Sequence, residues 1–253
     1  MRTWIAWLFI PLLSAAFAAV AETGEWGQAN ELYQKGQYGQ AVDVYQSLLK
    51  KAPGNPYLHY NLANAYFKQG ANASLGLAIV EYLRAYQLLP RDPDIRYNLD
   101  FALKRGGESL VPNGIPEAMH DAFYFLSESE LLGFLWIGWW ASLLLGSAYL
   151  LLGEKFRSKL RPWIWVSLLL LVSSGSWCGL RRMADIPNLG VTLEASTEAR
   201  SGPGSNFSVS FNAPEGRRVS ILSQEGDWVE INMIKEALQG WVPAKAVERV
   251  NAI

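Results

Sequence analysis

Two long stretches without a charged residue limit what this chain of 253 residues can fold into. They span residues 131–152 and 163–180. At 1.5 Å of rise per residue, helices of these lengths would be about 33 and 27 Å long, near the roughly 30 Å of a bilayer core. A buried helix pair of a soluble domain is the alternative, and uncharged runs of this length disfavour it. We therefore predict two transmembrane helices, joined by a cytoplasmic loop over 153–162.

The charges that flank these stretches predict their orientation. The loop at 153–162 carries four basic residues and one acidic residue, and cytoplasmic loops collect basic residues. Residues 1–21 combine one Arg, an apolar core and small residues, which is typical of a cleaved export signal. An uncleaved anchor is the alternative, and Arg181 and Arg182 weakly favour the opposite orientation. We expect a cytoplasmic (inner) membrane protein with both terminal parts on the periplasmic side.

Residues 22–105 carry a helical repeat. The motif Tyr-Asn-Leu at residues 60–62 recurs at 97–99, and Pro53 and Pro90 follow the second helix of each expected pair. Small residues where paired helices approach closely are Ala29, Ala41, Ala63 and Ala78. The pattern resembles tetratricopeptide (TPR) repeats, whose period is 34. The resemblance implies an all-α array with a single capping helix at its end; an unrelated helical bundle is the alternative.

The first helix of each TPR pair lines the concave face, where such arrays bind their ligands. Steps of three and four residues predict a mostly aromatic set on that face. Its members are Trp26, Asn30, Tyr33, Tyr57, Tyr60, Asn64, Phe67, Tyr97 and Phe101. Asn30 and Asn64 occupy equivalent places, and a carboxamide can bond both N–H and C=O of an extended peptide. We predict a peptide-binding groove centred on them.

The alternative to a peptide-binding groove is that these aromatic residues pack on one another or against the membrane-proximal segment. Some TPR proteins hold a terminal carboxylate with Lys and Arg around such an Asn, and aromatic residues stand in those places here, which argues against that class of ligand.

Residues 106–130 connect the array to the first apolar stretch. They begin as a Gly- and Pro-containing loop and continue over 118–126 as an aromatic-rich segment, which predicts a short helix at the membrane surface. Ser127 and Glu130 have the spacing of a capping box, so we expect the first membrane helix to begin there.

Residues 188–253 change to the alternating pattern of strands, and five short strands predict a small all-β barrel. The motifs at 199–204, 226–229 and 240–242 resemble the bacterial SH3 family and come in that family's order. The resemblance implies a module that binds cell-wall peptides or protein segments. Trp228 and Trp241 are candidates for its ligand face, with positions in the core as the alternative.

The order of the parts resembles the BatE-type membrane proteins of bacterial aerotolerance operons. The fold class is therefore multidomain: an all-α TPR array, a two-helix transmembrane hairpin and a small all-β SH3-like barrel. The resemblance implies partners among membrane-anchored von Willebrand type A-domain proteins, together with a MoxR-type ATPase system.

The chain offers little for catalysis. One Cys and two His cannot supply a four-ligand zinc site, and the net charge of −1 gives no reason to bind nucleic acid. No phosphate-binding Gly-rich loop or Gly-x-Ser-x-Gly motif is present. We expect a non-enzymatic scaffold for partner proteins, without cofactor or metal. The alternative is a sensor or anchor that binds peptidoglycan through the SH3-like domain.

Overall fold

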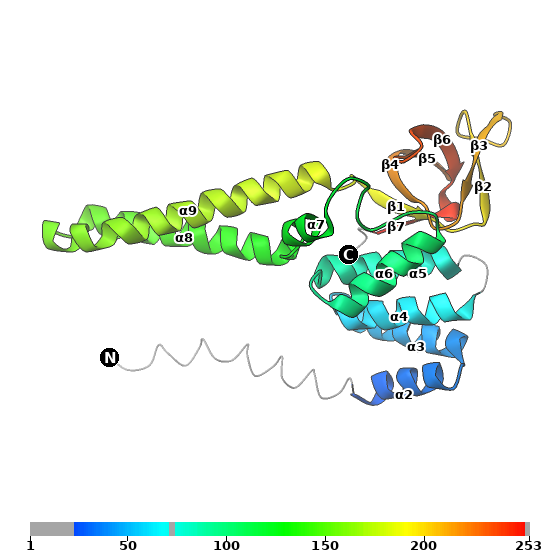
Figure 1. Cartoon of the computed structure of the whole chain (residues 1–253), viewed down its shortest axis with the longest axis horizontal. Helices are drawn as coiled ribbons and strands as arrows, with labels where there is room; N and C mark the ends of the chain where they lie inside the picture. Colours follow the sequence, from blue (N-terminus) through cyan, green and yellow to red (C-terminus); the bar gives the residue numbers. More distant parts are fainter. Residues whose placement is uncertain (1–22, 71–73, 251–253) are drawn as a thin grey trace.

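The computed structural model describes residues 23–70 and 74–250. The expected export signal, residues 1–21, lies outside the described residues. Figure 1 shows a helical array and a sheet packed together, with a hairpin of two long helices projecting from them.

Antiparallel helices form the array, in the order expected for two TPR pairs and a capping helix. They are α2 (Thr23–Gln34), α3 (Tyr38–Lys51), α4 (Pro56–Gln69), α5 (Ser74–Leu88) and α6 (Pro93–Arg105). The side chains of Asn55 and Asp92 accept backbone N–H groups at the starts of α4 and α6, each just before a proline. Gly36 and Gly70 follow the first helix of each pair with positive φ values of 76° and 62°, which favour glycine.

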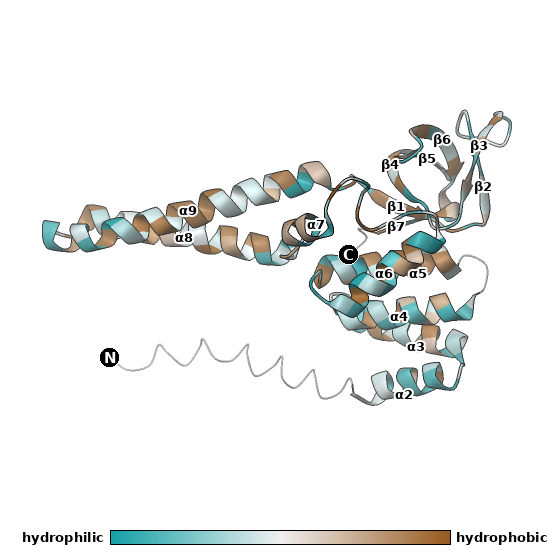
Figure 2. Ribbon diagram, in the orientation of Figure 1, coloured by the Kyte–Doolittle hydropathy of each residue, from teal (hydrophilic) through white to brown (hydrophobic). Residues whose placement is uncertain are grey.

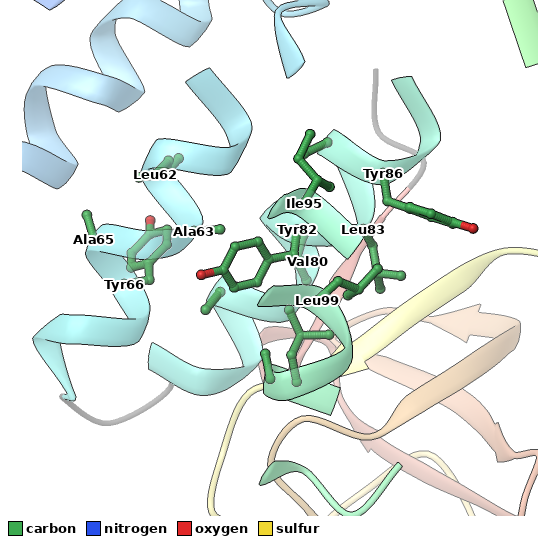
Figure 3. Packing of buried hydrophobic residues seen from close by; sticks show 14 of the residues in the cluster. Leu62, Ala63, Ala65, Tyr66, Val80, Tyr82, Leu83, Tyr86, Ile95 and Leu99 are labelled. Atoms are coloured by element: carbon green, nitrogen blue, oxygen red, sulfur yellow. The ribbon is translucent and has the colours of Figure 1, made fainter. Parts of the chain in front are cut away.

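Small and large side chains alternate in the core of the array. Ala29, Ala41, Ala63 and Ala78 are all fully buried, as close approach of paired helices requires. Figure 3 shows side chains such as Leu62, Tyr82 and Leu99 from neighbouring helices meeting in this core.

The hairpin consists of α8 (Glu128–Leu151) and α9 (Glu154–Ala184), preceded by the short helix α7 (Glu117–Phe123). Both long helices are long and apolar enough to cross a membrane, and Figure 2 shows hydrophilic residues at their turn. The Ser127–Glu130 capping box is present at the start of α8.

The segment 153–162 was expected to be a loop, but all of it after Gly153 is helical and forms the start of α9. Arg157 explains how the turn can be so short: its Nε donates to the carbonyl of Tyr149 (2.9 Å) and its Nη2 to that of Leu150 (3.3 Å). These bonds satisfy carbonyl groups that the end of α8 leaves open, so α9 can begin at Glu154.

The two helices of the hairpin touch along much of their length. A Cβ on Gly138 would lie 2.9 Å from the backbone nitrogen of Leu171, so only glycine fits at this crossing. Ser142 donates to Ser167 across the pair (3.1 Å). Close approach at a small residue and an interhelical hydrogen bond are typical of membrane helices.

The C-terminal part is an antiparallel sheet with the order β3-β2-β6-β5-β4-β1-β7. The strands are β1 (Leu189–Thr192), β2 (Ser196–Arg200), β3 (Val209–Pro214), β4 (Arg218–Glu225), β5 (Trp228–Met233), β6 (Leu238–Pro243) and β7 (Val247–Arg249), with a 3-10 turn, η2 (Ala244–Ala246), before the last. The expected count of five strands was wrong. The run from residue 191 to 200 is broken into two strands, and the Gly240-Trp241-Val242 motif lies inside an additional strand, β6, which precedes the last strand β7.

The array and the sheet share one hydrophobic core. Helix α5 packs on strands β1 and β7, and Leu189, Val191 and Val250 belong to the core cluster of the helices. At the start of α5, the Glu215 side chain from the sheet accepts the backbone N–H of Gly76 (3.0 Å). The two parts that the sequence predicted as separate domains are therefore one folded unit.

A polar network crosses the same interface. Arg84 on α5 pairs with Glu81 (2.5 Å), which in turn contacts buried His59 (2.5 Å). On the sheet side, Arg84 donates to the carbonyl groups of Arg249 (2.7 Å) and Val250 (3.1 Å).

The base of the hairpin is also fixed to the array. Arg91, just after α5, pairs with Glu130 at the start of α8 (2.6 Å). Tyr124, just after α7, donates to Asp185 at the end of α9 (3.0 Å), and Arg181 lies over the Tyr124 ring. The hairpin thus places the array and the sheet at the same end, away from its turn (Figure 1).

Gly76→Ala tests the contact between α5 and the sheet. The added Cβ would lie 2.5 Å from the backbone oxygen of Thr192, so the two parts must move apart. We expect a loss of about 1–3 kcal/mol in the free energy of unfolding, measured by chemical denaturation of the protein in detergent. Gly27→Ala in α2 is the control, because nothing lies within 4 Å of its Cβ and alanine favours a helix by about 1 kcal/mol. Equal effects of the two changes would contradict the shared core.

Candidate functional site

A hollow of about 330 Å³ opens on the face formed by the first helices of the repeats. Its lining is mostly aromatic with several amide and hydroxyl groups. The lining residues are Tyr33, Tyr60, Asn64, Phe67, Lys68, Tyr82, Tyr97, Asn98 and Phe101. We call this site the aromatic hollow.

The structure brings together six of the nine residues predicted for the groove: Tyr33, Tyr60, Asn64, Phe67, Tyr97 and Phe101. The other three lie outside the lining. Trp26 packs against the core of the array, Tyr57 is half exposed, and Asn30 bonds to the second helix of its own repeat. The hollow is therefore centred between α4 and α6 rather than between α2 and α4.

The two asparagines have partners within the array. Tyr45 donates to Oδ1 of Asn30 (2.6 Å), and Tyr82 donates to Oδ1 of Asn64 (2.5 Å), so the same bond occurs in both repeats. Burial raises the pKa of Tyr45 to about 12 and also raises the pKa of Tyr82. Both hydroxyl groups therefore stay protonated and act as donors. This changes the predicted role of the two amides, because each amide oxygen already accepts a hydrogen bond within the fold.

A second set of bonds orients the hydroxyl of Tyr60. Nδ2 of Asn98 donates to this oxygen (2.7 Å) and also lies 3.5 Å from Oδ1 of Asn64. Since the Tyr60 oxygen accepts from Asn98, its own proton is free for an acceptor in the hollow. The NH₂ group of Asn64 is a further donor there, because its oxygen carries the bonds that hold the side chain.

Aromatic rings and positive charge meet at one edge of the aromatic hollow. The rings of Phe67 and Phe101 lie 5.7 Å apart, and the Arg105 guanidinium lies 5.3 Å from the Phe67 ring centre. Exposed Lys68 is the charged member of the lining. This edge combines apolar contact area with two cations.

Sequence reasoning missed three residues of the lining: Lys68, Tyr82 and Asn98. Asn98 had a signal, because it lies three residues before Phe101 and therefore on the same side of its helix. Tyr82 had none, because it lies on the second helix of its repeat, and the prediction took only the first helices. Lys68 had none beyond its position one turn after Asn64.

The two tryptophans of the sheet lie on its outer face. Trp228 is paired with Pro243 and Trp241 with Glu230, whereas their neighbours Val229 and Val242 point into the sheet's core. The residues opposite one another in an antiparallel pair share a face, so both indoles are on the same side as diagonal neighbours. Both are half-buried, and neither is part of the core cluster.

Within residues 23–70 and 74–250, no group of three His, Cys, Asp or Glu side chains lies close enough together to hold an ion.

Tyr82→Phe removes the bond that holds Asn64. An unmade hydrogen bond at a mostly buried site costs about 1–2 kcal/mol, and we expect a loss of that size in the free energy of unfolding by chemical denaturation. Tyr57→Phe is the matched control, because Tyr57 is half exposed and its change should stay within about 0.5 kcal/mol. If Tyr82→Phe left the free energy of unfolding unchanged, the bond to Asn64 would not help to form the hollow.

The comparisons with known proteins agree with the helical part. A family model described as a TPR repeat matches residues 29–70, which run from the middle of α2 to just past the end of α4. No curated protein matches the chain. The family match and the paired helices together show that the chain contains TPR repeats.

Proposed function

We propose that this protein is a non-enzymatic scaffold, held in the cytoplasmic membrane by α8 and α9, that binds a partner protein in its aromatic hollow. TPR repeats are typical of proteins that bind other proteins through their concave face. The observation that supports the proposal most strongly is the hollow itself. It joins exposed rings with oriented hydrogen-bond donors on the face where such arrays bind ligands.

The exposure of the rings supports binding at this site. Tyr97 is 70% exposed and Phe101 is 52% exposed, although both are large and apolar. Exposed aromatic residues grouped at a hollow are common at protein interfaces, where they supply contact area at a low cost in conformational entropy.

The partner we propose is a membrane-anchored von Willebrand type A-domain protein, in a complex like that of BatE-type proteins. This rests on the resemblance of the whole arrangement, in which a TPR array, a hairpin and a C-terminal sheet follow one another. We place the array and the sheet on the periplasmic side because the basic residues gather at the turn of the hairpin.

Photo-crosslinking in intact membranes tests the scaffold. We expect Tyr97→p-benzoylphenylalanine to form a discrete adduct that mass spectrometry identifies as a von Willebrand type A-domain protein. Gln40→p-benzoylphenylalanine is the control, since Gln40 is exposed on the second helix of its pair. Adducts of the same pattern from both positions, or none from Tyr97, would contradict binding in the hollow.

Cysteine labelling tests the orientation. In a Cys178→Ser background, an impermeant maleimide added to spheroplasts should label Gln40→Cys on the array and Ser223→Cys on the sheet. Ser158→Cys, near the turn of the hairpin, should react only after the membrane is broken. Labelling of Ser158→Cys in sealed spheroplasts would reverse the proposed orientation.

Binding of peptidoglycan by the sheet is a second candidate function, favoured by the two outward-facing indoles. Purified full-length protein in detergent should then sediment with isolated cell-wall sacculi, and Trp228→Ala should reduce the bound fraction severalfold. The full chain is the proper reagent, because the sheet shares its core with the array. Equal sedimentation of the Trp228→Ala protein would remove this face as the binding surface.

A further inference from the structure

The polar groups of the aromatic hollow favour one kind of ligand chemistry. Tyr82 and Asn98 direct their protons to Oδ1 of Asn64, and Asn98 also donates to Tyr60. This leaves the Tyr60 hydroxyl proton and the Asn64 NH₂ group to be donated outward. Burial raises the pKa of the lining residue Tyr33 as well, so its hydroxyl also keeps a proton to donate. The hollow thus offers several donors to an acceptor-rich ligand, beside the amide oxygen of Asn98 and the hydroxyl oxygens, which can accept.

The positive charge at the edge of the aromatic hollow also favours a ligand that carries acceptors. Lys68 lies in the last turn of α4, and Arg105 is the last residue of α6. Because α4 and α6 are equivalent first helices of successive repeats, these ends lie at the same edge of the face. Among the residues that the structure describes, neither cation forms an ion pair, whereas nearby Lys35 and Lys104 are paired with Glu31 and Asp100.

Among the described residues, the lining of the hollow contains one charged side chain, Lys68, and no Asp or Glu. Arg105 is held over the Phe67 ring, which leaves the guanidinium N–H groups free for a carboxylate. A carboxylate that entered this edge would meet two cations next to two Phe rings.

We propose that the aromatic hollow binds an extended segment of its partner in which an Asp or Glu side chain stands beside an apolar residue. The backbone of the segment would bond with Tyr60 and Asn64, the acidic side chain with Lys68 and Arg105, and the apolar side chain would lie on Phe67 and Phe101. The two cations lie at the edge of the hollow and not in its centre. We therefore assign the acid to a side chain within the segment and not to a terminal carboxylate. This inference rests on the proposed function, because it names the ligand of the same site.

Selection from a random library tests the inference. A displayed library of dodecamer peptides is selected on the full-length protein in lipid nanodiscs, with empty nanodiscs as background. We expect Asp and Glu to be enriched, together with apolar residues, in the selected peptides. Synthetic copies of these peptides with an acetylated N-terminus and an amidated C-terminus should bind, because the proposed ligand group is an acidic side chain and not the terminal carboxylate.

Two matched double variants test whether Lys68 and Arg105 bind the acidic side chain. Lys68→Gln/Arg105→Gln should weaken the binding of these synthetic peptides about tenfold or more, as expected for the loss of charge-assisted hydrogen bonds. The double variant should also remove the enrichment of Asp and Glu in a repeated selection. Lys50→Gln/Lys245→Gln changes the net charge equally at exposed positions outside the lining and should leave both results unchanged. Circular dichroism checks that each variant is folded.

The outcomes separate the two proposals. If no peptide is selected above background, the aromatic hollow is not a peptide site and the proposed function fails with it. If peptides are selected without acidic enrichment, or bind Lys68→Gln/Arg105→Gln equally well, peptide binding stands and the acidic ligand is overturned. If binding needs a free terminal carboxylate, the commitment to an internal acidic side chain is overturned.

Discussion

The contact of Arg84 with the sheet is the interaction on which the arrangement of this protein depends. Arg84 joins Glu81 and the buried His59 within the array to the last strand of the sheet. Removing one member of such a network leaves a charge without its partner in a poorly solvated place, at a cost of about 3–5 kcal/mol. The network therefore works together with the apolar contacts of Val191 and Val250 to fix the sheet on α5.

This fixed contact determines which surfaces remain open for partners. The sheet covers α5, a second helix of a repeat, so the face lined by α4 and α6 stays free. The bonds of Arg91 and Tyr124 hold the base of the hairpin to the same unit. A partner bound in the aromatic hollow would thus be held at a set position relative to α8 and α9, as a scaffold requires.

The sequence predicted those features that depend on neighbours along the chain. The spacing of alanines and the recurring Tyr-Asn-Leu motif predicted the helix pairs, and Ser127 with Glu130 predicted the start of α8. The shared core could not be predicted, because the alternation at Leu189 and Val191 indicates burial without indicating which surface covers it. The helical start of α9 was missed for a similar reason: it depends on Arg157 reaching carbonyl groups of the preceding helix.

The candidate site shows the same division between local and distant information. Helical periodicity placed Asn64, Phe67 and Phe101 on one face, and the structure brings them together. It could not show that the Asn64 oxygen is taken by Tyr82, a residue on the other helix of the pair. That bond turns the amide from a group able to donate and accept into one that presents donors, and the nearby Lys68 adds positive charge. The donors that Asn64 presents to the hollow therefore depend on tertiary contacts.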